Sequence, residues 1–408
     1  MRTVVLCVTL LAVVVPSRTG AQVLTLTEAE ALSRLSPNNP RLRAIQAGLD
    51  LARIDVRAAG RWPNPRVMFD REAVAGIAEG ITTVTQLLPI TGRRAFDVRA
   101  ASSLVEAGAN RADDLRRRGR ADVRVSFAHL LAAQVREREL AEARDRLRAL
   151  ADILARREAV GDVSGFDRLR AEREVMEVEA DLASSATDRL RSQAALASLL
   201  DETVEPSRVV AVPTALPSAD WPPVEVLLER ALSTRGELLA LGKEVAAAQW
   251  ARRAADRRRV PEPEVVGGTK ASNFAGGDVG TVLAIQAVVP LFDRGRIEQA
   301  TAEARAAQAE RKAEVFRLAV RAEITALRTE IDERRATTAR YRTSALSSAA
   351  QIERIAHVSY DAGERGILEL LDAHRIGSAA RLRQVSLELA ARLAEIELEY
   401  VSGWEMPS

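Results

Sequence analysis

Two carboxylates near the end of the chain, Glu369 and Asp372, have the spacing that most clearly suggests a shared chemical task. They lie three residues apart and therefore share one face of a helix. They follow Gly363 and Gly366, and two glycines, each costing a helix about 1 kcal/mol relative to alanine, predict a turn there. Carboxylates on a shared face attract cations and repel one another unless a cation or an arginine compensates their charge. The alternative is that both are ordinary solvated helix charges, since 28% of the chain is charged.

Patterns for catalysis or metal binding do not occur elsewhere in the sequence. His129, His357 and His374 are scattered, and no pair has zinc-ligand spacing with a nearby acid. The glycine pairs at 267–268 and 276–277 are not followed by the Gly-Lys-Ser or Gly-Lys-Thr of a phosphate loop. We find no nucleophile with a base at a recognisable spacing. We therefore expect no enzyme activity, no cofactor and no metal site.

A second glycine-broken tip, at residues 160–166, matches the one at 360–367 and implies two matching halves. Each half contains opening helices, a β-hairpin, a long helix, a tip and a half-length return helix. We expect the following organisation: a signal peptide at 1–21, a first repeat at 22–205, a linker at 206–223, a second repeat at 224–403 and a tail at 404–408.

The hairpins are expected at residues 66–88 and 264–289. Closely spaced prolines before each one, Pro63 and Pro65 and then Pro261 and Pro263, end the preceding helix and favour extended backbone. Alternation along Val279 to Val289 is the best strand signal in the chain. In the first hairpin, apolar side chains alternate less regularly because Arg71 interrupts them.

Helix signals are strong in the rest of the chain, which is mainly α with a small β part. Leu140, Leu147 and Leu154 fall seven apart, as in the seam of a coiled coil. Thr27 with Glu30 three residues on predicts a capping box at the first helix. The second long helix is expected from about Arg296 to Asp361.

The first residues have the features of a secretory signal, with Arg2, an apolar run over 4–15 and small residues up to Ala21. A transmembrane anchor is the alternative, but about a dozen apolar residues are too few to span a bilayer. Cleavage would remove Arg2, Arg18 and the only cysteine, Cys7, so the net charge of +2 would fall by 2 to zero. Nucleic acid is therefore not an expected partner.

Four strands of roughly ten residues match the length of tilted transmembrane β-strands. A membrane tolerates no open sheet edge, because unpaired backbone groups in hydrocarbon cost several kcal/mol each. Several copies would therefore have to share one barrel, and three copies would supply twelve strands. The alternative is that the hairpins cap a soluble helical scaffold.

Several segments, in this order, resemble the TolC-like outer-membrane efflux proteins: Leu26-Thr27-Glu28-Ala29-Glu30-Ala31-Leu32, Asn39-Pro40-Arg41-Leu42, Pro63-Asn64-Pro65, Val289-Pro290-Leu291-Phe292-Asp293 and Ala362-Gly363 leading to Leu368-Glu369-Leu370-Leu371-Asp372-Ala373. The resemblance covers essentially the whole mature chain. It implies a homotrimer with a helical α-barrel and a shared 12-stranded β-barrel in the outer membrane of a Gram-negative cell envelope, and a large periplasmic part.

The resemblance also implies the function and the partners. The protein would be the passive exit duct of a tripartite efflux system for small molecules or metal cations. Its partners would be a periplasmic adaptor, an inner-membrane transporter of RND or ABC type and outer-membrane lipid. The segment from Thr91 to Arg94 is similar to members that serve heavy-metal efflux. The alternative function is a soluble periplasmic coiled-coil scaffold that binds partners through its tips.

Site residues follow from the same resemblance, matched to this sequence position by position. The gate is implied to be held by links at Tyr360, Arg365 and Asp167 and lined by an acidic ring of Glu369 and Asp372. Position 369 has glutamate where the best-known members have aspartate. The tip residues implied to contact the adaptor are Gly161, Asp162, Gly363 and Glu364.

Overall fold

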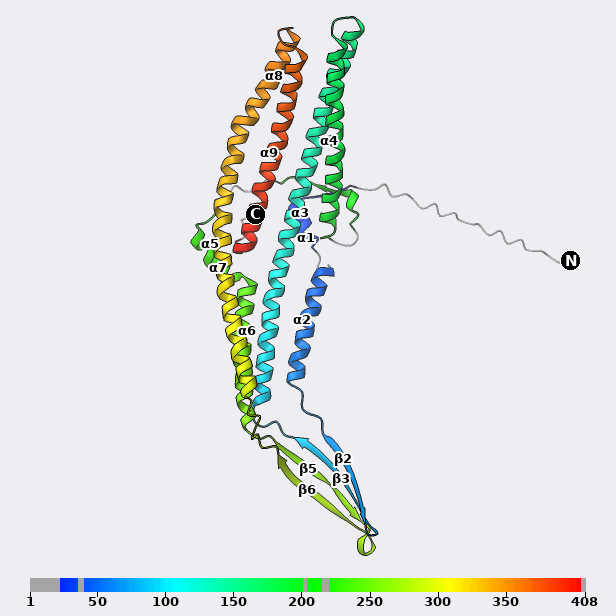
Figure 1. The fold of residues 1–408 in the computed structure, drawn as a ribbon, viewed down its shortest axis with the longest axis vertical. Coiled ribbons are helices and arrows are strands. Elements are labelled where there is room, and N and C mark those ends of the chain that lie inside the picture. The colour runs from blue at the N-terminus through cyan, green and yellow to red at the C-terminus, as the bar shows by residue number, and fades with distance from the viewer. Residues whose placement is uncertain (1–22, 36–39, 201–203, 215–219, 405–408) are drawn as a thin grey trace, which may run out of the picture.

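The computed structural model describes residues 23–35, 40–200, 204–214 and 220–404. The expected signal peptide, residues 215–219 of the expected linker and residues 405–408 of the expected tail lie outside the described residues. The molecule is elongated, with two helical hairpins ending side by side at one end and a small sheet at the other (Figure 1). The prediction of a mainly α-helical protein with a small β part is confirmed.

The elements of the first half are β1 (Leu24–Leu26), α1 (Glu28–Ser33), α2 (Pro40–Ala59), β2 (Arg66–Val74), β3 (Ile77–Leu87), α3 (Arg93–Ala159), α4 (Gly165–Ala197) and β4 (Val209–Ala211). The same order of helix, hairpin, long helix and return helix recurs in the second half. Its elements are α5 (Val224–Thr234), α6 (Gly236–Asp256), β5 (Pro263–Ser272), β6 (Asp278–Ala287), α7 (Arg296–Arg340), α8 (Ser347–Asp361) and α9 (Ile367–Ser402).

The two hairpins join into one antiparallel sheet in the order β2-β3-β5-β6. β3 pairs with β5 with Val84 opposite Gly267 and Thr83 opposite Gly268, and this pairing connects the two repeats. β2 and β6 are the edge strands, so each presents one row of backbone groups that has no partner within the sheet.

The register divides the sheet into an apolar face and a polar face, because successive side chains of a strand point to opposite sides. The apolar face carries Val67, Phe69, Val84, Val265, Val279, Leu283 and Ile285, and Arg71 and Gln86 also lie on it. The polar face carries Asp70, Glu72, Glu79, Glu264, Lys270 and Gln286, together with the apolar side chains Met68, Val74, Ile77, Ile81, Leu87, Val266 and Val282. Leu283 and Ile285 are 79% and 77% exposed, so the described residues of one chain leave the apolar face uncovered there.

Two local sequence predictions are confirmed in the helices. Leu140, Leu147 and Leu154 of the predicted seam are all buried. Thr27 and Glu30 form the predicted capping box, in which the Thr27 backbone N–H donates to Glu30 Oε2 at 2.7 Å.

The second long helix spans the expected bounds from Arg296 to Asp361, but its geometry changes along the way, because a π-helical segment at Tyr341–Leu346 lies between α7 and α8. Hydroxyl groups around it bind backbone carbonyls four residues back. Thr343 Oγ1 donates to the Ala339 carbonyl at 3.0 Å and Ser347 Oγ donates to the Thr343 carbonyl at 2.6 Å. Such bonds compete with the regular helical ladder and favour a local widening.

Candidate gate at the helical tips

Both tips are closed by the same backbone turn. In the first, the Gly161 N–H donates to the Glu158 carbonyl and the Asp162 N–H donates to the Arg157 carbonyl, both at 2.9 Å. Gly161 has φ of +81° and Gly363 has φ of +74°. These values are the left-handed conformation that this helix ending requires, and glycine adopts it readily.

The second tip repeats both hydrogen bonds. The Gly363 N–H donates to the Tyr360 carbonyl at 3.0 Å, and the Glu364 N–H donates to the Ser359 carbonyl at 2.8 Å. The predicted adaptor-contact residues are exposed in these turns: Gly161, Asp162, Gly363 and Glu364.

The two return helices begin differently. Ser164 caps α4, accepting a hydrogen bond from the Asp167 N–H at 3.3 Å and donating to Asp167 Oδ2 at 2.9 Å. Gly366 takes the same place before α9 and has no side chain to cap with. A Cβ added at Gly366 would lie 3.3 Å from Glu369 Oε2, so the Glu369 carboxylate lies beside the start of its own helix. A carboxylate in this place is stabilised by the positive end of the helix dipole.

Glu369 and Asp372 lie on the exposed side of α9, whereas Leu370 and Leu371 between them are buried. Leu370 and Leu371 belong to an apolar cluster that also includes Leu150 and Leu154 of α3. Both carboxylates are therefore exposed on α9 and have no ion-pair partner among the described residues.

The three predicted link residues are not brought together within one chain. No ion pair joins Arg365 to Asp167 in the described part of the chain, and Asp167 is bonded to Ser164 instead. The Tyr360 ring is half-buried beneath the Arg157 guanidinium, whose central carbon lies 5.7 Å from the ring centroid. The Tyr360 hydroxyl is buried and has no hydrogen-bond partner among the described residues.

A polar network behind the tips was not predicted from the sequence. Glu353 of α8 accepts a hydrogen bond from Arg381 Nη1 at 3.0 Å, and its Oε1 lies 3.1 Å from His374 Nδ1. Arg381 also pairs with Glu139 of α3 at 3.3 Å, so the network connects the second hairpin to the first. Gly377 makes room for it, since an added Cβ would lie 2.6 Å from the Glu353 carboxyl carbon. A glycine inside a long helix was the sequence signal that could have indicated this site.

The network changes the acidity of Glu353. Burial alone would raise the pKa of this carboxyl, but the hydrogen bonds from His374 and Arg381 outweigh burial and lower the pKa to about 2. Glu353 is therefore a carboxylate at neutral pH, held between two helices by its partners.

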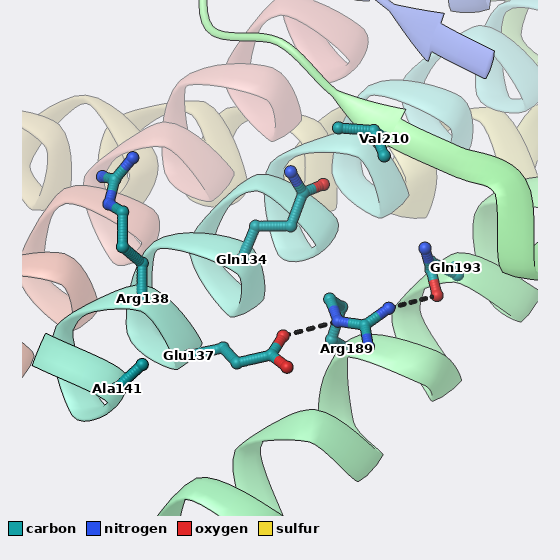
Figure 2. Close-up of a pocket in the computed structure, with 7 residues that line it drawn as sticks. All are labelled: Gln134, Glu137, Arg138, Ala141, Arg189, Gln193 and Val210. Atoms are coloured by element: carbon teal, nitrogen blue, oxygen red, sulfur yellow. Dashed lines mark hydrogen bonds and ion pairs between the residues drawn. The ribbon is translucent and has the colours of Figure 1, made fainter. Parts of the chain in front are cut away.

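A cavity of about 360 Å³ lies midway along the molecule between α3, α4 and β4 (Figure 2). Arg189 bridges Glu137 at 2.5 Å and Gln193 at 2.8 Å across it. Gln193 donates in turn to the Val209 carbonyl at 2.7 Å. These bonds fix α3 and α4 to β4, which pairs in parallel with β1. The lining is structural, with no nucleophile and base in contact.

The described ranges contain no group of three or more His, Cys, Asp or Glu side chains placed to hold a metal ion. No helix within them combines the length and apolarity needed to cross a membrane.

Known proteins resemble this chain along most of its length. It is 27% identical over 370 residues to the cobalt-zinc-cadmium resistance protein CzcC of Cupriavidus metallidurans, covering 89% of this chain and 86% of that protein. The fold matches a membrane protein from Pseudomonas aeruginosa with a TM-score of 0.77 at 20% identity, over 92% of this chain and 93% of that one. It matches the outer membrane protein VceC of Vibrio cholerae with a TM-score of 0.75 at 19% identity, over 92% and 96%. No protein-family model matches the chain.

The solved structures share the fold from the tips to the sheet, and the CzcC match extends over the same length. The likeness therefore includes both repeats and is not confined to one helical hairpin. Proteins of this type are channels and not enzymes. The resemblance to TolC-like outer-membrane efflux proteins that the sequence motifs indicated is confirmed, since this chain is similar to CzcC and shares the fold of the solved outer membrane proteins over about nine tenths of its length.

Proposed function

We propose that three copies of this chain form a passive export duct across the outer membrane. The observation that carries the proposal is the two-faced sheet. Its apolar face, with Phe69 68% and Leu283 79% exposed, suits contact with lipid. Its polar face, with the Lys270–Glu79 ion pair at 2.6 Å, suits a water-filled interior. Apolar side chains outside and polar side chains inside are the pattern of membrane β-barrels.

Closure of the sheet requires more than one chain. β2 and β6 each have an unpaired edge, and an open edge cannot remain in hydrocarbon. Pairing β6 of one copy with β2 of the next removes both edges, and three copies give a barrel of twelve strands. The helices of the three copies then continue the tube as an α-barrel towards the tips.

The tips form the gate in this proposal. Threefold symmetry brings Glu369 and Asp372 of each copy around one axis, giving a ring of six carboxylates that favours cations. Tyr360, Arg365 and Asp167 link neighbouring hairpins and hold the ring closed. A periplasmic adaptor binds at Gly161, Asp162, Gly363 and Glu364 and opens the tips, while an inner-membrane transporter supplies the driving force.

Metal cations are the proposed cargo. The support is the name of the Cupriavidus relative, which describes resistance to cobalt, zinc and cadmium, together with the similarity of the Thr91–Arg94 segment to metal-efflux members. A strain lacking this protein is expected to become sensitive to at least one of these ions, and drug sensitivity without metal sensitivity would exclude metal export.

Membrane fractionation tests the duct directly. The protein should sediment with outer membranes and migrate on SDS gels as a trimer that dissociates on heating. A soluble monomer in the periplasmic fraction would instead support a coiled-coil scaffold that binds partners through its tips.

A further inference from the structure

Arginines gather in the segments where the helices meet the sheet. This junction lies between the lower ends of α3, α6 and α7 and the strands (Figure 1). The chain passes between sheet and helix four times. Each passage places an exposed apolar residue nearer the strand and one or more arginines on the helix side. The four passages are Arg61 and Trp62 before β2, Ile90 then Arg93 and Arg94 after β3, Arg257–Arg259 then Val260 before β5, and Phe292 then Arg294 and Arg296 after β6.

Asp97 of α3 lies at this level and forms no ion pair among the described residues, but four other acids there already have arginine partners. Glu262 pairs with Arg93 at 3.5 Å. Arg258 pairs with Asp293 at 3.4 Å and with Glu298 at 2.7 Å. Asp256 and Arg259 lie 3.7 Å apart. These carboxylates therefore do not supply partners for the other arginines of the junction.

Four of those other arginines lie over aromatic rings, and we call them the stacked arginines: Arg94, Arg99, Arg253 and Arg257. Trp250 lies between two of them, with the guanidinium carbon of Arg99 at 4.8 Å and that of Arg253 at 4.4 Å from its ring centroid. Phe96 stacks on Trp250 with centroids 5.9 Å apart. None of the four forms an ion pair in the part of the chain that the structure describes. Stacking occupies the flat face of a guanidinium and leaves its N–H edge available.

We propose that the stacked arginines bind the phosphate groups of anionic phospholipids at the periplasmic surface of the membrane. This inference rests on the proposed function, because it needs the apolar face of the sheet to lie in lipid. The sheet then ends at the level of the headgroups, where tryptophan is enriched in membrane proteins. A guanidinium group can donate two parallel hydrogen bonds to one phosphate group. Basic residues near a bilayer surface also attract anionic lipids.

Quenching of tryptophan fluorescence by brominated lipids tests the inference. The full-length trimer is reconstituted into vesicles that contain brominated phosphatidylglycerol or brominated phosphatidylcholine in competition with unlabelled phosphatidylcholine. Trp62 and Trp250 report binding at the junction, while Trp221 and Trp404 lie near the middle of the molecule and supply a constant background. The unaltered protein should prefer phosphatidylglycerol by about fivefold or more, and high salt should reduce that preference.

Two variants are compared that each lose four positive charges, one at the junction and one in the tip half of the molecule. Replacing all four stacked arginines by glutamine should bring the ratio of phosphatidylglycerol binding to phosphatidylcholine binding close to one. The control replaces Arg156, Arg170, Arg354 and Arg383 by glutamine, since these are exposed arginines in the tip half without a carboxylate partner among the described residues. The control should keep the preference.

Equal quenching of the unaltered protein by both lipids would overturn the inference and leave the duct intact. A full preference retained by a stacked-arginine variant that still runs as a trimer would also overturn it. Absence of quenching by either lipid would show that the sheet is not in the membrane, and the proposed function itself would then fail. If the variant does not assemble, the preference of the unaltered protein and its salt dependence decide the question.

Discussion

Asp167 and Glu369 occupy the same position in the two tips, as the third residue of the helix that returns from a glycine-closed turn. In α4 this position serves the fold, because Asp167 exchanges two hydrogen bonds with Ser164. In α9 the capping residue is Gly366, so Glu369 lacks the equivalent partner. The duplication thus leaves one carboxylate bonded within its own helix and the other without such a bond, as the proposed gate requires.

Neutralising the acidic ring should weaken the interaction of the pore with cations. In the variant Glu369→Gln with Asp372→Asn, we expect block by divalent cations to weaken roughly tenfold, because the ring loses its charge. Planar-bilayer recordings of single channels measure this. Asp152→Asn, an exposed acid of α3 outside the ring, is the control that should leave the block unchanged. Unaltered block in the ring variant would mean that these acids do not line the pore.

Asp167 can be tested for a link role separately from its capping role. Asp167→Asn removes the charge but keeps an oxygen that can accept from Ser164, whereas Ser164→Ala weakens the cap and keeps the charge. If a link to Arg365 of a neighbouring copy holds the gate, Asp167→Asn and Arg365→Ser should both raise single-channel conductance. Ser164→Ala should not. If Ser164→Ala raises the conductance and Asp167→Asn does not, Asp167 acts in capping alone.

Gly377→Ala should lower the apparent melting temperature, although alanine normally favours a helix by about 1 kcal/mol over glycine. The added methyl group would collide with the Glu353 carboxylate and displace it from His374 and Arg381. Gly242→Ala in α6, where nothing lies within 4 Å of the added Cβ, is the matched control and should be neutral or stabilising. Equal effects of the two substitutions on thermal unfolding would argue against the network.

Glu353 should contribute stability that depends on pH in a defined direction. Its pKa is lowered from 4.5 to about 2 in the folded protein, so its contribution is complete above about pH 4.5 and is lost as the pH falls towards 2. The difference in melting temperature between the unaltered protein and Glu353→Gln should therefore shrink over that interval. A difference that grows on acidification would contradict the assignment.

Local signals in the sequence were sufficient for the tips, the seam and the strand alternation. Gly161 and Gly363 predict helix endings because the left-handed backbone of such an ending is a local requirement that glycine meets. Leu140, Leu147 and Leu154 predict burial through their spacing alone. In β6, Leu283 and Ile285 fall on the apolar face as their alternation indicates.

Features that depend on distant segments were not predictable in this way. The parallel pair β1 and β4 joins Leu24 to Val209 over three residues each, too short for a pattern in either segment. The contact of Glu353 with His374 and Arg381 requires the relative placement of two helices, which spacing within one helix does not determine. The π-helical segment after Arg340 depends on hydroxyl bonds to the backbone that many helical serines and threonines do not form.

The proposed barrel depends on pairing between β6 of one copy and β2 of the next. Cysteine cross-linking tests it most directly, with Val67→Cys in β2 combined in turn with cysteine at Val279, Thr281, Leu283 or Ile285 in β6, in a Cys7→Ser background. All these positions lie on the apolar face. Within one chain the two strands are separated by three strand spacings, about 14 Å, which is too far for a disulfide. At least one combination should give disulfide-linked dimers and trimers in outer membranes, whereas monomers in every combination would contradict the shared barrel.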